Sequence, residues 1–159
     1  MKRIGFLAVL TGLVPVLVSM VLTFAAGAAL AHDDAYLDTQ KAPNSGQLRM
    51  AGPYHYELVL AKNATAAQEN PVVVYVTDHA GAKISTAGAS GSATILAGKL
   101  KATATLKPEG ENMLKGFAKY ASSPDTKVVV SVTLAGKQAE QARFTPLAVA
   151  KDGHTDHKH

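Results

Sequence analysis

Cysteine and tryptophan are absent from this chain of 159 residues. Without cysteine, the protein can form no disulfide, no thiolate zinc site and no iron–sulfur cluster, and it has no thiol nucleophile. Beyond residue 31 the methionines are Met50 and Met113 alone, so a methionine-rich copper(I) site is not expected. Any metal site must therefore depend on histidine, on carboxylate or on a free amine.

Acidic residues and histidine are absent from residues 1–31. Lys2 and Arg3 precede an apolar run over residues 4–28, and Ala29-Leu30-Ala31 supplies the small side chains of a signal-peptidase site. This pattern predicts a secretory signal peptide over residues 1–31. Its removal takes away two basic residues and lowers the formal net charge of +4 by two.

A retained membrane anchor is the alternative for this segment, because about 25 apolar residues can cross a bilayer about 30 Å thick. Pro15 and the small residues before His32 favour cleavage. We therefore expect a periplasmic protein that begins at His32. After cleavage neither a membrane nor a nucleic acid is expected among its partners, the latter because of the compartment and the small net charge.

The pattern between residues 46 and 147 is that of β-strands. Residues 71–76 and 127–134 are β-branched runs of strand length, and residues 54–60 alternate between two faces. Weaker patterns of the same kind lie at 46–50, 92–96, 100–106, 113–120 and 141–147. We predict an all-β domain over residues 46–149, an antiparallel β-sandwich that is immunoglobulin-like in the broad sense.

The two flanks of this domain differ from it in composition. Residues 32–45 and 150–159 are polar, and we predict that both are flexible. Four of the six histidines lie in these flanks, so metal chemistry is sought there first.

The C-terminal flank brings His154, His157 and His159 together with two aspartates. Imidazole and carboxylate on one short segment suit zinc(II), copper(II) or nickel(II). We predict that these histidines bind metal with modest affinity, because ordering a flexible segment costs about 1–2 kcal/mol per residue. The alternative is a solvated terminus without a ligand.

The N-terminal flank offers a second site if cleavage follows residue 31. His32 would then present its free α-amine and its imidazole to one ion, with Asp33 as an optional oxygen ligand. Such a chelate favours copper(II) and tightens as the pH rises, because protons compete for the amine. The alternative is that His32 merely follows the cleavage point.

A third set of residues lies inside the predicted domain. His55 and Glu57 alternate with Tyr54 and Tyr56 and so project from the opposite face of one strand. His79 lies in a predicted turn and approaches them only if the topology brings it there. We interpret His55 and Glu57 as an ordinary solvent-facing pair rather than as metal ligands.

Three segments resemble a known family. Residues 41–59, 74–81 and 141–147 look like parts of the small periplasmic β-sandwich proteins found with heavy-metal efflux systems. They are also similar to the N-terminal module of cobalt–zinc–cadmium-type efflux adaptor subunits. Asn44-Ser45-Gly46 stands where that family has His-Gly-Gly, so its ligand histidine is missing here. The resemblance implies metal homeostasis as context and an efflux adaptor subunit as partner.

No motif of a catalytic site is found: the chain lacks Gly-x-Ser-x-Gly, His-Glu-x-x-His and a glycine-rich phosphate loop. We therefore predict a protein without enzymatic activity. The predicted function is periplasmic binding or buffering of copper or zinc in support of metal resistance or efflux. The alternative is a β-sandwich interaction module that docks on an efflux or envelope partner through an edge strand, with incidental histidines.

Overall fold

The computed structural model describes residues 34–148. The predicted signal peptide at 1–31 and the predicted C-terminal flank at 150–159 lie outside the described residues. One helix, α1 (Asp34–Thr39), precedes eight strands. The strands are β1 Gln47–Ala51, β2 Tyr54–Leu60, β3 Glu69–Thr77, β4 Ser90–Ala97, β5 Leu100–Pro108, β6 Met113–Lys119, β7 Lys127–Thr133 and β8 Ala139–Phe144.

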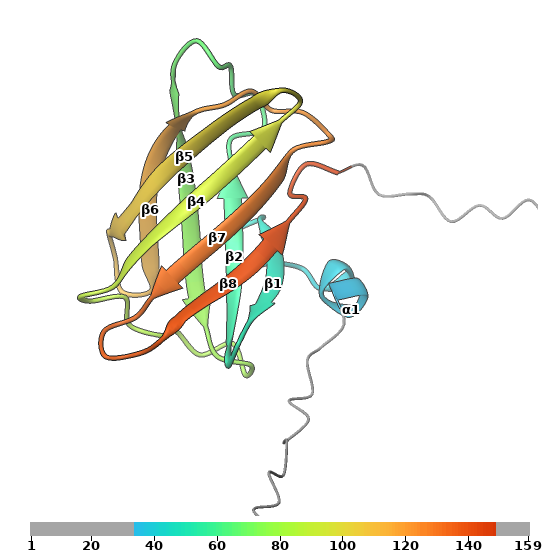
Figure 1. Ribbon diagram of the computed structural model, residues 1–159. Coiled ribbons are helices and arrows are strands. Elements are labelled where there is room, and N and C mark those ends of the chain that lie inside the picture. The colour runs from blue at the N-terminus through green and yellow to red at the C-terminus, as the bar shows by residue number, and fades with distance from the viewer. Residues whose placement is uncertain (1–33, 149–159) are drawn as a thin grey trace, which may run out of the picture. The chain divides into compact units, whose positions relative to one another are not determined.

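The strands form one antiparallel sheet in the order β1-β2-β3-β6-β5-β4-β7-β8 (Figure 1). The predicted all-β class and antiparallel pairing are confirmed. The sheet differs from two separate layers because β5 belongs to both halves: residues 100–106 pair with β4, and Lys107 and Pro108 pair with β6. A strand that changes partner along its length joins the halves into one nearly closed sheet.

The two edge strands, β1 and β8, face each other across a seam. At one end the Thr145 amide donates a hydrogen bond to Gln47 Oε1 at 2.8 Å. At the other end Gly52, with a φ of 57°, lies so close to Glu140 that an added Cβ would be 2.4 Å from its carboxyl carbon. Among the described residues β1 and β8 share no ladder, so side chains and turns hold the seam.

The core fills the inside of this curved sheet. Strand alternation sends Val128, Val130 and Val132 of β7 inward, and the other strands do the same. The largest fully buried side chains are Tyr56, Tyr120 and Phe144. Each buried Val, Leu or Phe contributes about 1.5–3 kcal/mol relative to an exposed one. Residues 34–148 therefore contain a complete hydrophobic core.

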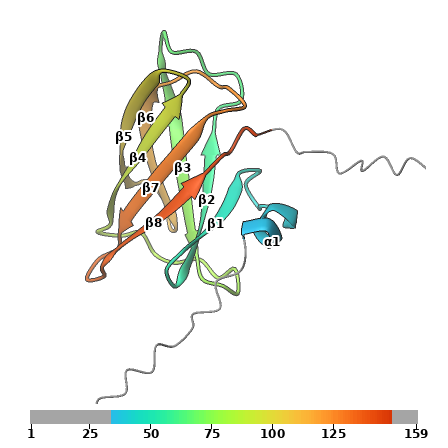
Figure 2. The same ribbon diagram turned by 45° about the vertical axis from the view of Figure 1, so that its right-hand side comes forward.

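Residues 34–46, the N-terminal strap, begin with α1 and run beside β1 (Figure 2). Its residues Leu37 and Ala42 are buried, although the sequence predicted a flexible flank over residues 32–45. Arg49 of β1, itself buried, donates a hydrogen bond to Asp38 at 2.7 Å and lies 3.6 Å from Asp34. A buried guanidinium needs carboxylate partners, and α1 supplies them to Arg49.

The hydrogen bond from Arg49 lowers the pKa of the Asp38 carboxyl below its usual value of 3.8, although burial opposes the shift. Asp38 is half exposed, so water screens the interaction. The ionised carboxylate therefore contributes modestly to holding α1 on β1.

Candidate functional site

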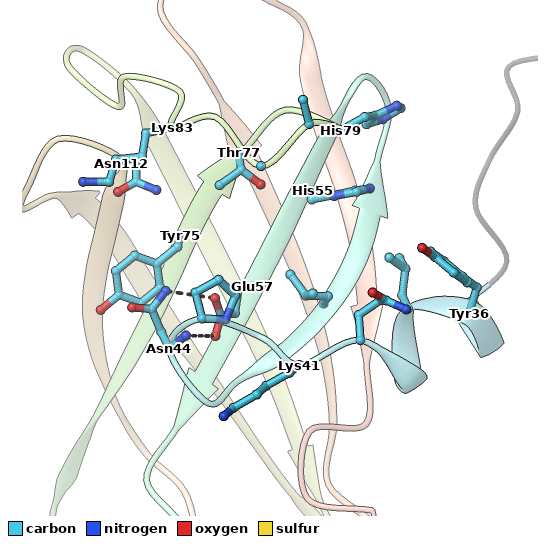
Figure 3. Close-up of a pocket in the computed structure, with 16 residues that line it drawn as sticks. Tyr36, Lys41, Asn44, His55, Glu57, Tyr75, Thr77, His79, Lys83 and Asn112 are labelled. Atoms are coloured by element: carbon cyan, nitrogen blue, oxygen red, sulfur yellow. Dashed lines mark hydrogen bonds between the residues drawn. The ribbon is translucent and has the colours of Figure 1, made fainter.

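A pocket of about 530 Å³ lies on the outer side of β1, β2 and β3. The N-terminal strap forms one wall, and the turn that follows β3 forms another (Figure 3). Aromatic and polar side chains line it together, among them Tyr36, Tyr75, His55 and His79. This volume matches the size of small-molecule sites in proteins, which begin at about 300 Å³.

Alternation in β2 and β3 supplies the floor of the pocket. Tyr56 and Leu58 point into the core, so His55 and Glu57 point outward, as their spacing predicted. The antiparallel register places His55 opposite Thr77 and Glu57 opposite Tyr75. Two residues from each strand thus share one outward surface beneath the strap.

Glu57 is only 3 % exposed, and its carboxylate is fixed by the strap. Its Oε1 accepts hydrogen bonds from the amides of Asn44 at 2.7 Å and Gly46 at 2.9 Å, and its Oε2 accepts one from Asn44 Nδ2 at 2.9 Å. The interpretation of Glu57 as solvent-facing was wrong, because the strap covers it. Three charge-assisted hydrogen bonds offset the cost of burying a carboxylate.

The same contact lies within residues 41–59, the longest of the segments on which the family resemblance rests. Asn44-Ser45-Gly46 folds over Glu57, and Ser45 adopts a φ of 60°, which non-glycine residues seldom do. An added Cβ at Gly46 would lie 2.4 Å from the Leu58 carbonyl oxygen, so only glycine fits this approach. The turn and the glutamate therefore form one structural unit.

His79 comes from the turn after β3 and stacks on His55. The imidazole centroids are 4.9 Å apart and the ring planes differ by 20°. His55 is half-buried, and His79 is exposed at the rim of the pocket (Figure 3). The topology thus brings together two histidines that are 24 positions apart in sequence, as the register of β2 with β3 requires.

Asp78 holds His79 in this position. Asp78 Oδ1 accepts hydrogen bonds from the amides of Ala80 at 2.9 Å and Ala82 at 2.8 Å, and Gly81 has a φ of 82°. An aspartate that binds its own turn and a glycine with positive φ are typical of a defined tight turn. The His79 backbone is therefore well positioned, and its exposed ring stacks on His55.

The remaining polar lining lies at the far side of the pocket. Lys83 forms an ion pair with Glu111 at 3.0 Å, and Asn112 Nδ2 donates to the Val76 carbonyl at 3.1 Å. Both ends of the Lys83 ion pair are more than half exposed, so it contributes at most about 1 kcal/mol. Lys41 lines the pocket from the strap. These groups give the pocket a mixed surface without a strong single charge.

The metal ligands predicted from the sequence lie outside the described residues: His32, Asp33, His154, His157 and His159. Across residues 34–148, histidine and acidic side chains do not gather in groups of three or more that could hold a metal ion. His55 and His79 are thus two donors on the described surface rather than a complete coordination sphere.

Comparison with known proteins adds no relative: no family model, curated protein or solved structure matches this chain. The resemblance to efflux-associated proteins therefore stays a prediction. Of the helices in the described part of the chain, none has the length and apolar character that crossing a membrane demands.

Tyr36 and Asn44 belong to the site but were not recognised in the sequence. Both lie in the strap, whose polar composition indicated a flexible flank. One signal was available: Leu37 and Ala42 are spaced apolar residues in an otherwise polar stretch, and both are buried against the domain. The closeness of His79 to His55 was not predictable without strand order.

Proposed function

We propose that the protein binds a divalent transition metal, copper(II) or zinc(II), and that His55 and His79 supply two nitrogen donors. The closeness of these two imidazoles, whose centroids are 4.9 Å apart at the rim of the pocket, is the observation that carries the proposal. Imidazole nitrogen is a preferred ligand of both metals, and the arrangement includes no catalytic constellation. The proposed role is binding or buffering, without a chemical step.

Metal binding requires a small rearrangement of the rings. A bound ion lies in the plane of each imidazole, about 2.0–2.1 Å from the nitrogen, so two nearly parallel stacked rings cannot both point at it. His79 is exposed at the rim whereas His55 is half-buried on β2, so we expect His79 to make the larger movement. Because protons compete with metal for imidazole nitrogen, affinity is expected to rise with pH.

Further donors complete the coordination sphere in this proposal. The predicted ligands His32, Asp33, His154, His157 and His159 are available in the sequence, and water can fill the positions that they leave. A site with two histidines from the domain and further donors from the flanks suits an exchangeable metal rather than a permanently bound ion.

The proposed setting is the periplasm, in support of metal resistance or efflux, with an efflux adaptor subunit as a partner that receives or delivers the metal. Two sequence features support it: the signal-peptide pattern of residues 1–31 and the resemblance of residues 41–59 to efflux-associated β-sandwich proteins.

One observation favours the alternative of a docking module. The pocket, at about 530 Å³, is far larger than a metal ion, and Tyr36 at its edge is 52 % exposed. Exposed aromatic side chains beside a pocket are common in protein interfaces. In this alternative the pocket receives a side chain of a partner, and the two histidines only shape its rim.

Calorimetric titration with zinc(II) and with copper(II) tests the proposal on the chain that starts at His32. The matched variants are His55→Ala, His79→Ala and, as a control from the same pocket, Lys83→Ala. We expect each histidine replacement to weaken binding by tenfold or more, about 1.4 kcal/mol, and the lysine replacement to leave it unchanged. A variant that ends at Lys151 measures the share of His154, His157 and His159.

The outcomes distinguish metal binding at His55 and His79 from metal binding by the C-terminal flank and from the docking module. Binding that is unaffected by both histidine replacements and lost with the C-terminal flank would remove His55 and His79 from the site. If neither metal binds better than about millimolar, about 4 kcal/mol, metal binding is rejected and the docking module remains.

A further inference from the structure

The outward residues of β4, β5, β7 and β8, called here the basic face, carry one sign of charge. Lys101 and Lys107 of β5, Lys127 of β7 and Arg143 of β8 are all exposed. The acidic residue within these strands, Glu140, is opposite Val132 and so points to the inner side of the sheet. The other outward positions are mainly Ser and Thr, such as Thr103 and Ser131 on β5 and β7.

An exposed leucine lies among these cations. Leu96 of β4 is 43 % exposed, and its direct neighbours in the ladder are Lys101 on β5 and Lys127 on β7. Leu100, also 43 % exposed, follows at the end of the β4–β5 hairpin, next to Lys99 in the turn. Apolar side chains flanked by lysines recur where proteins lie on a lipid surface.

The pocket lies on the same outer surface of the sheet but over its other half, β1, β2 and β3. Strands β4, β5 and β7 lie in front in Figure 1, whereas β2 and β3, which carry the pocket, lie behind them. The pocket side carries acidic residues as well as basic ones, such as Glu111, which pairs with Lys83. Asp34 lies at the seam, where it lines a hollow together with Arg143 of β8. Lys101, Lys107 and Lys127 form no ion pair among the described residues, so basic charge without an acidic partner is a property of β5 and β7 on the basic face.

We propose that the basic face docks on an anionic lipid bilayer surface, with Leu96 at the interface and Lys101 and Lys127 against lipid phosphates. The pocket then faces away from the bilayer and stays open to solvent. This proposal departs from the expectation that no membrane is a partner after cleavage, and it does not depend on metal binding.

Two contributions favour a lipid surface over a soluble acidic protein: the attraction of the cations to anionic headgroups and the contact of the exposed leucine with the interface. Each Lys or Arg near an anionic bilayer contributes about 1 kcal/mol, and the gain disappears within a Debye length, about 8–10 Å at physiological salt. The lysine stems can lie along the leucine while their ammonium groups reach the phosphates. A sheet surface with several cations and an exposed leucine thus supports weak, salt-sensitive association rather than insertion.

Vesicle sedimentation tests this proposal on the chain that starts at His32. One set of vesicles is phosphatidylcholine alone, and the other contains phosphatidylglycerol as well. We expect sedimentation with the anionic vesicles only, weakened by added salt. The double variant Lys101→Glu/Lys127→Glu is expected to bind at least about tenfold more weakly, and Lys41→Glu/Lys83→Glu, on the pocket side, is expected to bind like the wild type.

A third variant separates lipid from other polyanions. Leu96→Ser keeps every charge, so a severalfold loss of vesicle binding supports the proposed contact with the interface. The proposal is overturned by equal binding to both kinds of vesicle, by no binding to either, or by equal losses in the two double variants. Unchanged vesicle binding by Leu96→Ser together with tight binding to heparin would assign the face to a soluble polyanion instead.

Discussion

In both halves of this sheet the side chains alternate between the core and the outer surface. The two halves differ in whether the N-terminal strap covers the outward side chains. Over β1, β2 and β3 the N-terminal strap folds across the outward residues and buries Glu57. Over β4, β5 and β7 the outward residues are mainly Ser, Thr and Lys, with Leu96 among them, and they are half-buried or exposed. Coverage by a distant segment therefore decides whether an outward side chain becomes part of a site or stays a solvated surface.

Replacements on the two surfaces should therefore lower the free energy of unfolding by different amounts. Replacements under the strap disturb buried polar contacts, which are expensive to leave unmade. Replacements on the basic face disturb groups that water solvates equally well in the folded and unfolded chain, so they should change binding rather than stability.

The largest loss is expected from Glu57→Ala. This change leaves the backbone amides of Asn44 and Gly46, both in the strap, without their acceptor. The free energy of unfolding should therefore fall by about 2–4 kcal/mol. Denaturant unfolding measures it. Glu111→Gln, which removes only an exposed ion pair, is the control and should cost less than about 1 kcal/mol. Equal losses in the two variants would show that the strap does not depend on Glu57.

A smaller loss, about 1–3 kcal/mol, is expected from Gly46→Ala. The new methyl group would lie 2.4 Å from the Leu58 carbonyl oxygen, which is backbone and cannot move aside cheaply. Gly110→Ala is the matched control, because the nearest atom there is 3.5 Å from the added Cβ. Thermal unfolding of both variants checks the prediction, and an unchanged melting temperature for Gly46→Ala would contradict the close packing of the strap on β2.

Asp38→Asn should cost about 1 kcal/mol or less at neutral pH, since Asp38 is half exposed. The folded pKa lies below the usual 3.8, so the carboxylate stabilises the protein above that pH, and this stabilisation is lost as the pH falls through the folded pKa. Unfolding curves of both proteins should therefore differ at pH 7 and converge in acid. A gap that stays constant as the solution is acidified, or one that widens, would exclude the Arg49 contact as the cause.

The smallest change in stability is expected on the basic face. Lys101→Glu/Lys127→Glu should alter the free energy of unfolding by about 0.5 kcal/mol or less, because both side chains are exposed and form no ion pair among the described residues. The same urea titration used for Glu57→Ala measures it. A loss as large as that of Glu57→Ala would contradict the expectation that replacements on the basic face cost less stability than replacements beneath the strap.

The strands were predictable because their signal is local. Residues 127–134 and 71–76 read as β-branched runs, and Lys127–Thr133 and Glu69–Thr77 are strands. The single continuous sheet was not predictable, because it depends on β5 changing partners between β4 and β6. Nothing in the local pattern of residues 100–108 distinguishes a strand that joins two halves from one that ends a layer.

The site shows the same limit. The outward direction of His55 and Glu57 followed from the period of a strand, and it is confirmed. The burial of Glu57 and the stacking of His79 on His55 were missed, since both depend on residues distant in sequence. The ligands proposed near the chain ends, His32 and His154 among them, lie outside residues 34–148 and stay predictions.

The most direct test of the account is a map of backbone and imidazole chemical shifts during titration of the chain from His32 with zinc(II). We expect the signals of both stacked rings, His55 and His79, to shift together with those of their pocket neighbours. The signals of Leu96 and Lys127 on the basic face should stay unchanged. Shifts that leave His55 and His79 untouched, or that spread equally over both faces, would contradict it.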